Sequence, residues 1–222
     1  MNSLKILLSA SLLALSAVPS LADGPGGQSG DGSNILNTQI NLQNNWSNLN
    51  VTVDTVGANV VGQGAAAGNL IDITTMNNTR VTNSQTVGPG ATIGSNINMQ
   101  VSNVWGSVAI QNQVVCNSAS ISTDPVLTSV NSNQECHAAD PFSGIGTSLR
   151  NIAGDAVVQS SALGNSFEAD SNAPNFPITT RQLNNSANVS SVNASAINVG
   201  GSVGFSSSAI GNTSQIIHYN AH

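Results

Sequence analysis

Two cysteines, Cys116 and Cys136, and the adjacent His137 are the side chains whose types could do chemistry. They could form a disulfide, give thiolate and imidazole ligands to a metal ion, or supply a nucleophile with a neighbouring base. Adjacent residues seldom bind one metal ion, and no fourth ligand is evident. Sequence neighbours also rarely reach the geometry that a base needs. We therefore predict no catalytic residue, no metal site and no cofactor.

Residues 1–22, MNSLKILLSASLLALSAVPSLA, carry a single lysine followed by the apolar run 6–18. The segment ends on small residues at the positions that signal peptidase reads, which is typical of a secretory signal peptide. A transmembrane anchor is the alternative, but the run is broken by serines and shorter than the roughly 20 residues of a span. We predict an exported chain, in which a Cys116–Cys136 disulfide is the default and contributes about 3 kcal/mol.

Past that segment the chain has three arginines against ten acidic side chains. Nucleic acid needs several cations that displace its counterions, so it is excluded as a partner. The acids occur singly, without the spacing of a calcium loop or the paired carboxylates of polysaccharide-cleaving enzymes. We interpret them as solvated charges or as gatekeepers against uncontrolled strand stacking. They are Asp23, Asp31, Asp54, Asp72, Asp124, Asp140, Asp155, Asp170, Glu135 and Glu168, beside Arg80, Arg150 and Arg181.

Amide and hydroxyl groups take the place of charge, with 31 Asn, 32 Ser and 21 Gly in the chain. Apolar residues alternate with these polar ones at period two, as in NLNVTVD (48–54) and SVAIQ (107–111). That period is typical of β-strands, and Asn and Gly are poor helix formers. The sequence therefore predicts an all-β chain, whose strands must position the side chains named above.

A nineteen-residue unit recurs without a gap, starting at Asn103, Asn151 and Asn198. A shortened copy starts at Asn59 and lacks a few residues, so the period is 44 to 48 residues. We expect two strand–turn–strand layers in each period. The glycines shared by the ungapped copies are Gly106, Gly154 and Gly201.

A Gly-Asn step follows each first strand, and both residues tolerate positive φ, which predicts a tight turn or corner. Cys116 replaces the glycine in one copy, and the segment 122–150 after it departs from the repeat. We therefore expect an inserted loop there, pinned by the disulfide. The structural turn residues are Gly68, Asn69, Asn117, Gly164, Asn165, Gly211 and Asn212.

One such unit cannot bury its apolar face alone, whereas stacked copies can. Stacking aligns equal positions, so asparagine amides can pair along the stack, while aligned charges would repel. We predict a repeat-built β-solenoid or curlin-like stack of strand–turn–strand layers, with a β-sandwich as the alternative. The domains are a Gly-rich leader (23–33) and one repetitive β domain (34–222).

Gln or Ser precedes the Gly-Asn corner in QSSALGNSFEA (159–169) and SSSAIGNTSQI (206–216). In this pattern the chain resembles the repeats of curlin-type secreted fibre subunits. It also resembles curli-like proteins that anchor the adhesive holdfast of stalked bacteria to the envelope. The resemblance covers most of 34–220, with a longer period and Gln kept only at Gln111 and Gln159. It implies partners among its own copies or related fibre and anchor subunits, and an outer-membrane secretion pore.

Two functional hypotheses follow. The first is a structural protein of the bacterial cell surface, a subunit or anchor of an adhesive fibre or holdfast-like assembly that self-associates by β-stacking and is not an enzyme. The second is a carbohydrate-binding or polysaccharide-degrading β-helix protein. Its sugar-binding form requires Trp46 and Trp105 to be exposed on one face.

Overall fold

The computed structural model describes residues 33–219 except 77, 124–127 and 174. The predicted signal peptide and all of the predicted leader but Ser33 lie outside the described residues. Within the described ranges there is no helix that could cross a membrane. The elements are β1 (Ser33–Asn41), β2 (Asn45–Val56), β3 (Val60–Thr75), β4 (Thr79–Val87), β5 (Ile93–Val104), β6 (Val108–Thr123), β7 (Thr128–Cys136), β8 (Phe142–Ile152), β9 (Ala156–Ser171), β10 (Ile178–Asn184), β11 (Val189–Val199) and β12 (Val203–His218).

The strands form three parallel sheets of four strands each. Sheet A has the order β1-β4-β7-β10, sheet B β2-β5-β8-β11 and sheet C β3-β6-β9-β12. The chain therefore completes one turn every three strands: rung 1 is β1–β3, rung 2 is β4–β6, rung 3 is β7–β9 and rung 4 is β10–β12. The protein is an all-β, repeat-built β-solenoid, as the sequence predicts.

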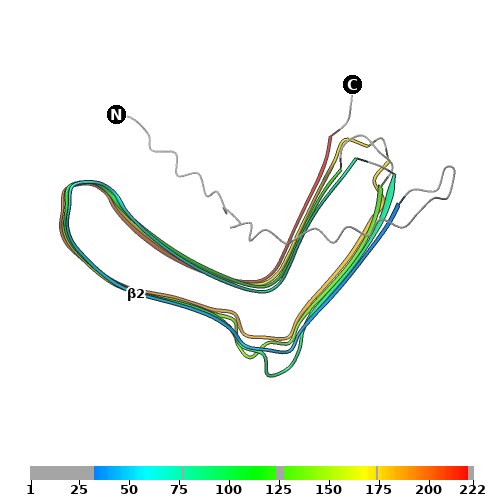
Figure 1. The fold of residues 1–222 in the computed structure, drawn as a ribbon, viewed down its shortest axis with the longest axis horizontal. Helices are drawn as coiled ribbons and strands as arrows, with labels where there is room; N and C mark the ends of the chain where they lie inside the picture. Colours follow the sequence, from blue (N-terminus) through cyan, green and yellow to red (C-terminus); the bar gives the residue numbers. More distant parts are fainter. Residues whose placement is uncertain (1–32, 77, 124–127, 174, 220–222) are drawn as a thin grey trace.

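Seen along the stack, each rung has a bent outline with two arms (Figure 1). In one arm the first half of each sheet C strand packs against sheet B, and in the other the second half packs against sheet A. Apolar side chains fill both arms and the bend, as three clusters. Representative members are Ile97 and Ile110 in the first arm, Val81 and Ile121 in the second, and Val114 at the bend.

Alternation of side chains in the strands explains the cluster positions. Val108, Ile110 and Val114, which share a parity in the repeat, all face inward and are buried. In the two inner rungs this alternation leaves every second residue buried, as in β7. The two outer rungs have the same alternation but keep their inward side chains half exposed in β2 and β11, because no further rung of the described residues covers them.

Three expectations about the repeat were wrong. Each period holds one rung of three strands instead of two layers. The first copy has no gap, because Val56 pairs with Val104 and Val60 with Val108, so Thr55 and not Asn59 corresponds to Asn103. The segment 122–150 is no inserted loop: outside 124–127, it holds β7 and most of β8, both paired in register with their neighbours.

Candidate functional site

The long strands of sheet C bend near their middle (Figure 1), and the Gly-Asn pair lies near the middle of β3, β9 and β12. Pairing between β3 and β6 runs residue by residue on both sides of this point but skips Gly68 and Cys116. Two consecutive side chains then face inward, and Cys116 and Asn117 are both fully buried. A Cβ on Gly68 would lie 2.5 Å from the carbonyl oxygen of Cys116. Close approach of the next rung, and not backbone φ, therefore requires the small residue.

Positive φ is found elsewhere in the repeat. The first residues of the three ungapped copies have φ between 54° and 58°, and Thr55 takes the same conformation in rung 1. No residue of the Gly-Asn steps is among the described residues with positive φ, so the expected reason for the corner was wrong although a bend is present. The left-handed residues in the copies are Asn103, Asn151 and Asn198.

At the bend, one asparagine from each rung joins a continuous ladder, whose members are buried in rungs 1 to 3 and exposed in rung 4. Each side-chain amide Nδ2 donates to Oδ1 of the next asparagine at 2.8 Å, so donation runs from rung 1 to rung 4. The second N–H of the first three donates to a backbone carbonyl of sheet A: Thr86, Glu135 and Leu183. This buried asparagine ladder, Asn69, Asn117, Asn165 and Asn212, is the predicted amide pairing along the stack, and it also ties sheet C to sheet A.

A second ladder, which the sequence analysis missed, runs through sheet A. In rungs 2 to 4, the glutamine Nε2 donates to Oε1 of the glutamine in the preceding rung at 2.9 Å. Donation therefore runs from rung 4 to rung 1. Each also donates to a backbone carbonyl of sheet C. Recurrence of Gln after 46, 49 and 48 residues was the available signal. The glutamine ladder consists of Gln39, Gln85, Gln134 and Gln182.

A third ladder lies in solvent at the turn between sheets B and C. Asn198 donates to Asn151 and Asn151 to Asn103, each at 2.8 Å. Asn103 in turn donates to the carboxylate of Asp54 at 2.8 Å, which also accepts the Ser102 hydroxyl. The hydrogen bonds from Ser102 and then Asn103 lower the pKa of Asp54. We call this the exposed asparagine ladder.

The repeat glycines lie in the same turn, where the rungs approach closely. Gly154 N–H donates to the Gly106 carbonyl at 3.0 Å, and Gly201 N–H to the Gly154 carbonyl at 3.1 Å. A Cβ on Gly201 would lie 2.7 Å from the Gly154 carbonyl oxygen. These glycines therefore allow tight stacking of the turn.

The Cys116–Cys136 disulfide is present and joins β6 of rung 2 to the end of β7 in rung 3, across 20 residues of sequence. Both cysteines are fully buried in the apolar cluster at the bend. The bridge thus links two rungs and two sheets. His137 lies beside Glu135 at 3.5 Å, and the described residues contain no group of three or more potential metal ligands.

Side chains of like charge are kept apart along the stack. In the described register pairs, Asp54 faces Ser102, Asp72 faces Ser120 and Glu168 faces Ser120 and Gln215. No such pair joins two charges of the same sign. Arg181 contacts Glu135 at 2.5 Å, and this interaction, followed by that with Asn133, lowers the pKa of Glu135.

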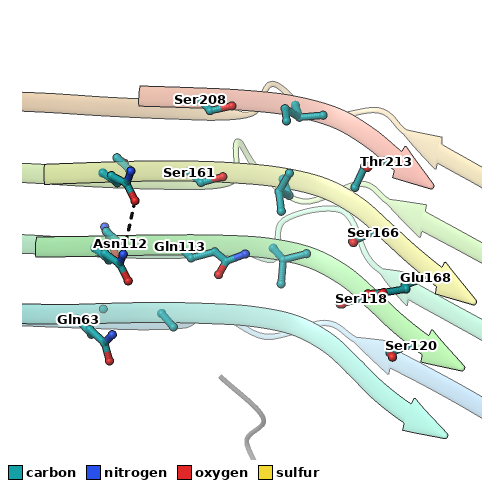
Figure 2. Close-up of a pocket in the computed structure, with 18 of the residues that line it drawn as sticks. Gln63, Asn112, Gln113, Ser118, Ser120, Ser161, Ser166, Glu168, Ser208 and Thr213 are labelled. Carbon is teal, nitrogen blue, oxygen red and sulfur yellow. Dashed lines mark hydrogen bonds between the residues drawn. The ribbon is translucent and has the colours of Figure 1, made fainter. Parts of the chain in front are cut away.

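The outer side of the bend in sheet C is a groove of about 450 Å³ that crosses the strands. Figure 2 shows its labelled side chains coming from stacked strands, with amide groups at Gln63 and Gln113 and hydroxyls at Ser161 and Ser208. Glu168 is the one ionisable side chain among the described residues that line the groove. Repeated neutral donors and acceptors are chemistry that suits hydroxyl-rich ligands.

The aromatic residues considered for sugar binding do not share one site. Trp46 begins β2 and is 54% exposed, and its ring lies over Gly94 and stacks on Phe142 with centroids 6.2 Å apart. Trp105 is 76% exposed in the turn after β5, at the opposite end of the sheet B strands. Comparison with known proteins adds no relative, because no family model, curated protein or solved structure matches this chain.

Proposed function

We propose that the chain is an exported structural subunit of a cell-surface assembly, such as an adhesive fibre or its anchor, and that it self-associates by stacking rung on rung. Export rests on the signal-peptide pattern of residues 1–22. Self-association rests on the two outer rungs. Its partners are copies of the chain or related subunits, and a secretion pore of the outer membrane is a further partner that the resemblance implies.

The observation that carries the proposal is the pair of open ends. Within the part of the chain that the structure describes, β1, β2 and β3 form the outer edges of the three sheets on one side, and β10, β11 and β12 on the other. Unpaired N–H and C=O groups on such an edge are a template for another strand. A large apolar side chain adds to the rung 4 end: Phe205 is 44% exposed, whereas Val158 and Ile110, at the same position in rungs 3 and 2, are fully buried.

The experiment is sedimentation and electron microscopy of the purified chain lacking residues 1–22, over a range of concentrations. We expect fibres with strands stacked about 4.8 Å apart along their axis. Phe205→Lys, which places a charge on an outer rung, should abolish fibres. Gln159→Lys places the same charge on an inner rung facing the groove, and it should leave fibres intact. Wild-type protein that stays monomeric at all concentrations contradicts the proposal.

The groove favours a second candidate function, binding of a linear neutral polysaccharide. Its amide and hydroxyl side chains repeat from rung to rung, as the hydroxyls of a linear glycan repeat from sugar to sugar. Titration with neutral β-linked glucan oligosaccharides, followed by amide chemical shifts, tests this. Shifts confined to groove residues, weakened by Gln111→Ala and unaffected by the distant Asn98→Ala, are expected. Unchanged spectra at millimolar oligosaccharide contradict it.

A further inference from the structure

We infer that the stacking contact has a single polarity and register, in which rung 4 of one copy pairs with rung 1 of the next. In this contact β1, β2 and β3 of the next copy lie beside β10, β11 and β12. This inference rests on the proposed self-association and names its partner surface. In this register Asn212 meets Asn69 of the next copy, and Gln182 meets Gln39.

The direction of the buried asparagine ladder is the first argument. Donation runs toward rung 4, so Asn212 accepts from Asn165 and, among the described residues, has no ladder neighbour to which it can donate. At the other end, Asn69 donates to Asn117 and Thr86, and its Oδ1 receives no ladder donor. Rung 4 thus offers an amide donor at the place where rung 1 offers an acceptor.

The glutamine ladder gives the second argument, because it runs the opposite way. Gln39 accepts from Gln85 and uses one N–H on the Leu70 carbonyl. Its other N–H has no ladder acceptor, whereas Gln182 lacks only a ladder donor to its Oε1. Rung 1 therefore offers a donor at the place where rung 4 offers an acceptor. Both ladders continue only if rung 4 meets rung 1. Two like ends would run their strands antiparallel and leave the ladder amides without these neighbours.

Side chains of the two outer rungs are compatible in the same register. Extending the described pairings by one rung places Ile178 next to Ile35 and Ile216 next to Ile73. Phe205, the largest side chain at its position, lies over Gly62, the smallest.

Charges raise no obstacle at this contact. Asp54 meets Ile197, Asp72 meets Gln215 and Arg181 meets Thr38, so no like charges face each other. The contact thus follows the rule that holds between the rungs of one copy.

Cysteine cross-linking tests polarity and register together. Ile40 and Leu183 share one position of sheet A and are 65% and 37% exposed. Neighbouring strands lie about 4.8 Å apart, which is within disulfide range. Mixing an Ile40→Cys variant with a Leu183→Cys variant under mild oxidation should therefore give heterodimeric disulfides.

The matched control replaces Ile40→Cys by Leu36→Cys, on the same face of β1. Four residues shift the thiol by about 13 Å along the strand, so cross-linking to Leu183→Cys should fall at least tenfold. Fibres that instead cross-link Ile40→Cys to itself, or Leu36→Cys to Leu183→Cys, overturn the polarity or register and leave self-association standing. Absence of assembly in wild-type protein contradicts both the proposed self-association and the polarity and register inferred from it.

A second variant tests the asparagine contact itself. Asn212→Asp keeps the acceptor for Asn165 but cannot donate to Asn69 of the next copy while ionised. We expect a fibre-forming concentration at least tenfold higher at pH 7, recovering in acid when the carboxyl is protonated and can donate. Gln159→Glu adds the same charge on an inner rung and should change little. Equal fibre formation by Asn212→Asp and wild type at pH 7 overturns the Asn212–Asn69 pairing.

Discussion

The buried and the exposed asparagine ladders use the same side chain in different surroundings. The buried ladder runs at the bend from rung 1 to the exposed Asn212 of rung 4, and its three buried members also donate to carbonyls of sheet A. The exposed ladder lies at a solvent-facing turn and ends on the carboxylate of Asp54. One ladder joins two sheets inside the protein, whereas the other follows a single turn.

Different physical demands select asparagine at the two places. At the bend, a buried side chain must satisfy both amide hydrogens and its oxygen, because unpaired polar groups are costly away from water. At the exposed turn the backbone has positive φ, which asparagine adopts more readily than most residues. The first ladder is thus set by hydrogen bonding and the second chiefly by backbone conformation.

The largest effect is expected from Asn117→Ala in the middle of the buried ladder. The substitution removes the acceptor of Asn69 and the donors to Asn165 and Glu135, so we expect a loss of about 3 kcal/mol in the free energy of unfolding. Urea denaturation measures it. Asn98→Ala, which loses one exposed hydrogen bond to Asn50, is the control and should change stability by less than about 0.5 kcal/mol. Similar losses in both variants would show that burial does not decide how much an asparagine side chain contributes to stability.

The next effect concerns the bend that holds the buried ladder. In Gly164→Ala the new Cβ would clash with the Gly211 carbonyl of rung 4 and with the Asn184 side chain. We expect a loss of about 2 kcal/mol in unfolding free energy. Gly204→Ala on β12, where a Cβ meets nothing within 4 Å, should be neutral or stabilising by about 0.5 kcal/mol. Equal thermal midpoints for the two variants would contradict close rung contact at the bend.

Strand periodicity and the stacked Asn positions could be predicted from the sequence because both depend on residues a fixed distance apart. Val108 and Ile110 alternate with polar residues, and Asn117 and Asn165 fall 48 residues apart, so fold class and buried ladder follow directly. The true start of the first copy, four residues earlier than expected, could not be found, since Asn59 imitates the repeat start that Thr55 occupies in the structure.

The repeat in sheet A could not be found by comparing segments of the chain with one another. Spacing between its glutamines varies from 46 to 49 residues because the connections between strands differ in length. Cys116 replaces glycine at the bend, and the segment 122–150 contains no match to the nineteen-residue unit. These two features made the regular strands β7 and β8 resemble an insertion. The sequence also could not predict the backbone conformation at the Gly-Asn step, because close contact and positive φ both favour glycine.

A smaller effect separates backbone from hydrogen bonding in the exposed ladder. Asn151→Ala loses two ladder bonds and places alanine at φ 54°, which costs about 1 kcal/mol for the left-handed backbone alone. Asn151→Gly loses the same bonds without that strain. We expect the alanine variant to be the less stable by about 1 kcal/mol in urea denaturation. Equal stability would mean that the hydrogen bonds, and not the backbone, select asparagine here.

The smallest effect is the pH dependence that Asp54 gives to the exposed ladder. Its hydrogen bonds from Ser102 and Asn103 lower its pKa in the folded chain below the ordinary value of 3.8. The unfolded state therefore binds the proton at higher pH, so this stabilisation is complete above the unfolded pKa and is lost as pH falls through the folded pKa. Denaturation midpoints between about pH 5 and pH 2 should fall more steeply for wild type than for Asp54→Asn. The difference should be small and shrink with added salt, because Asp54 is exposed and solvent screens it. The buried ladder, by contrast, contains no ionisable group. Parallel curves for wild type and Asp54→Asn would mean that the carboxylate adds nothing that an amide cannot supply.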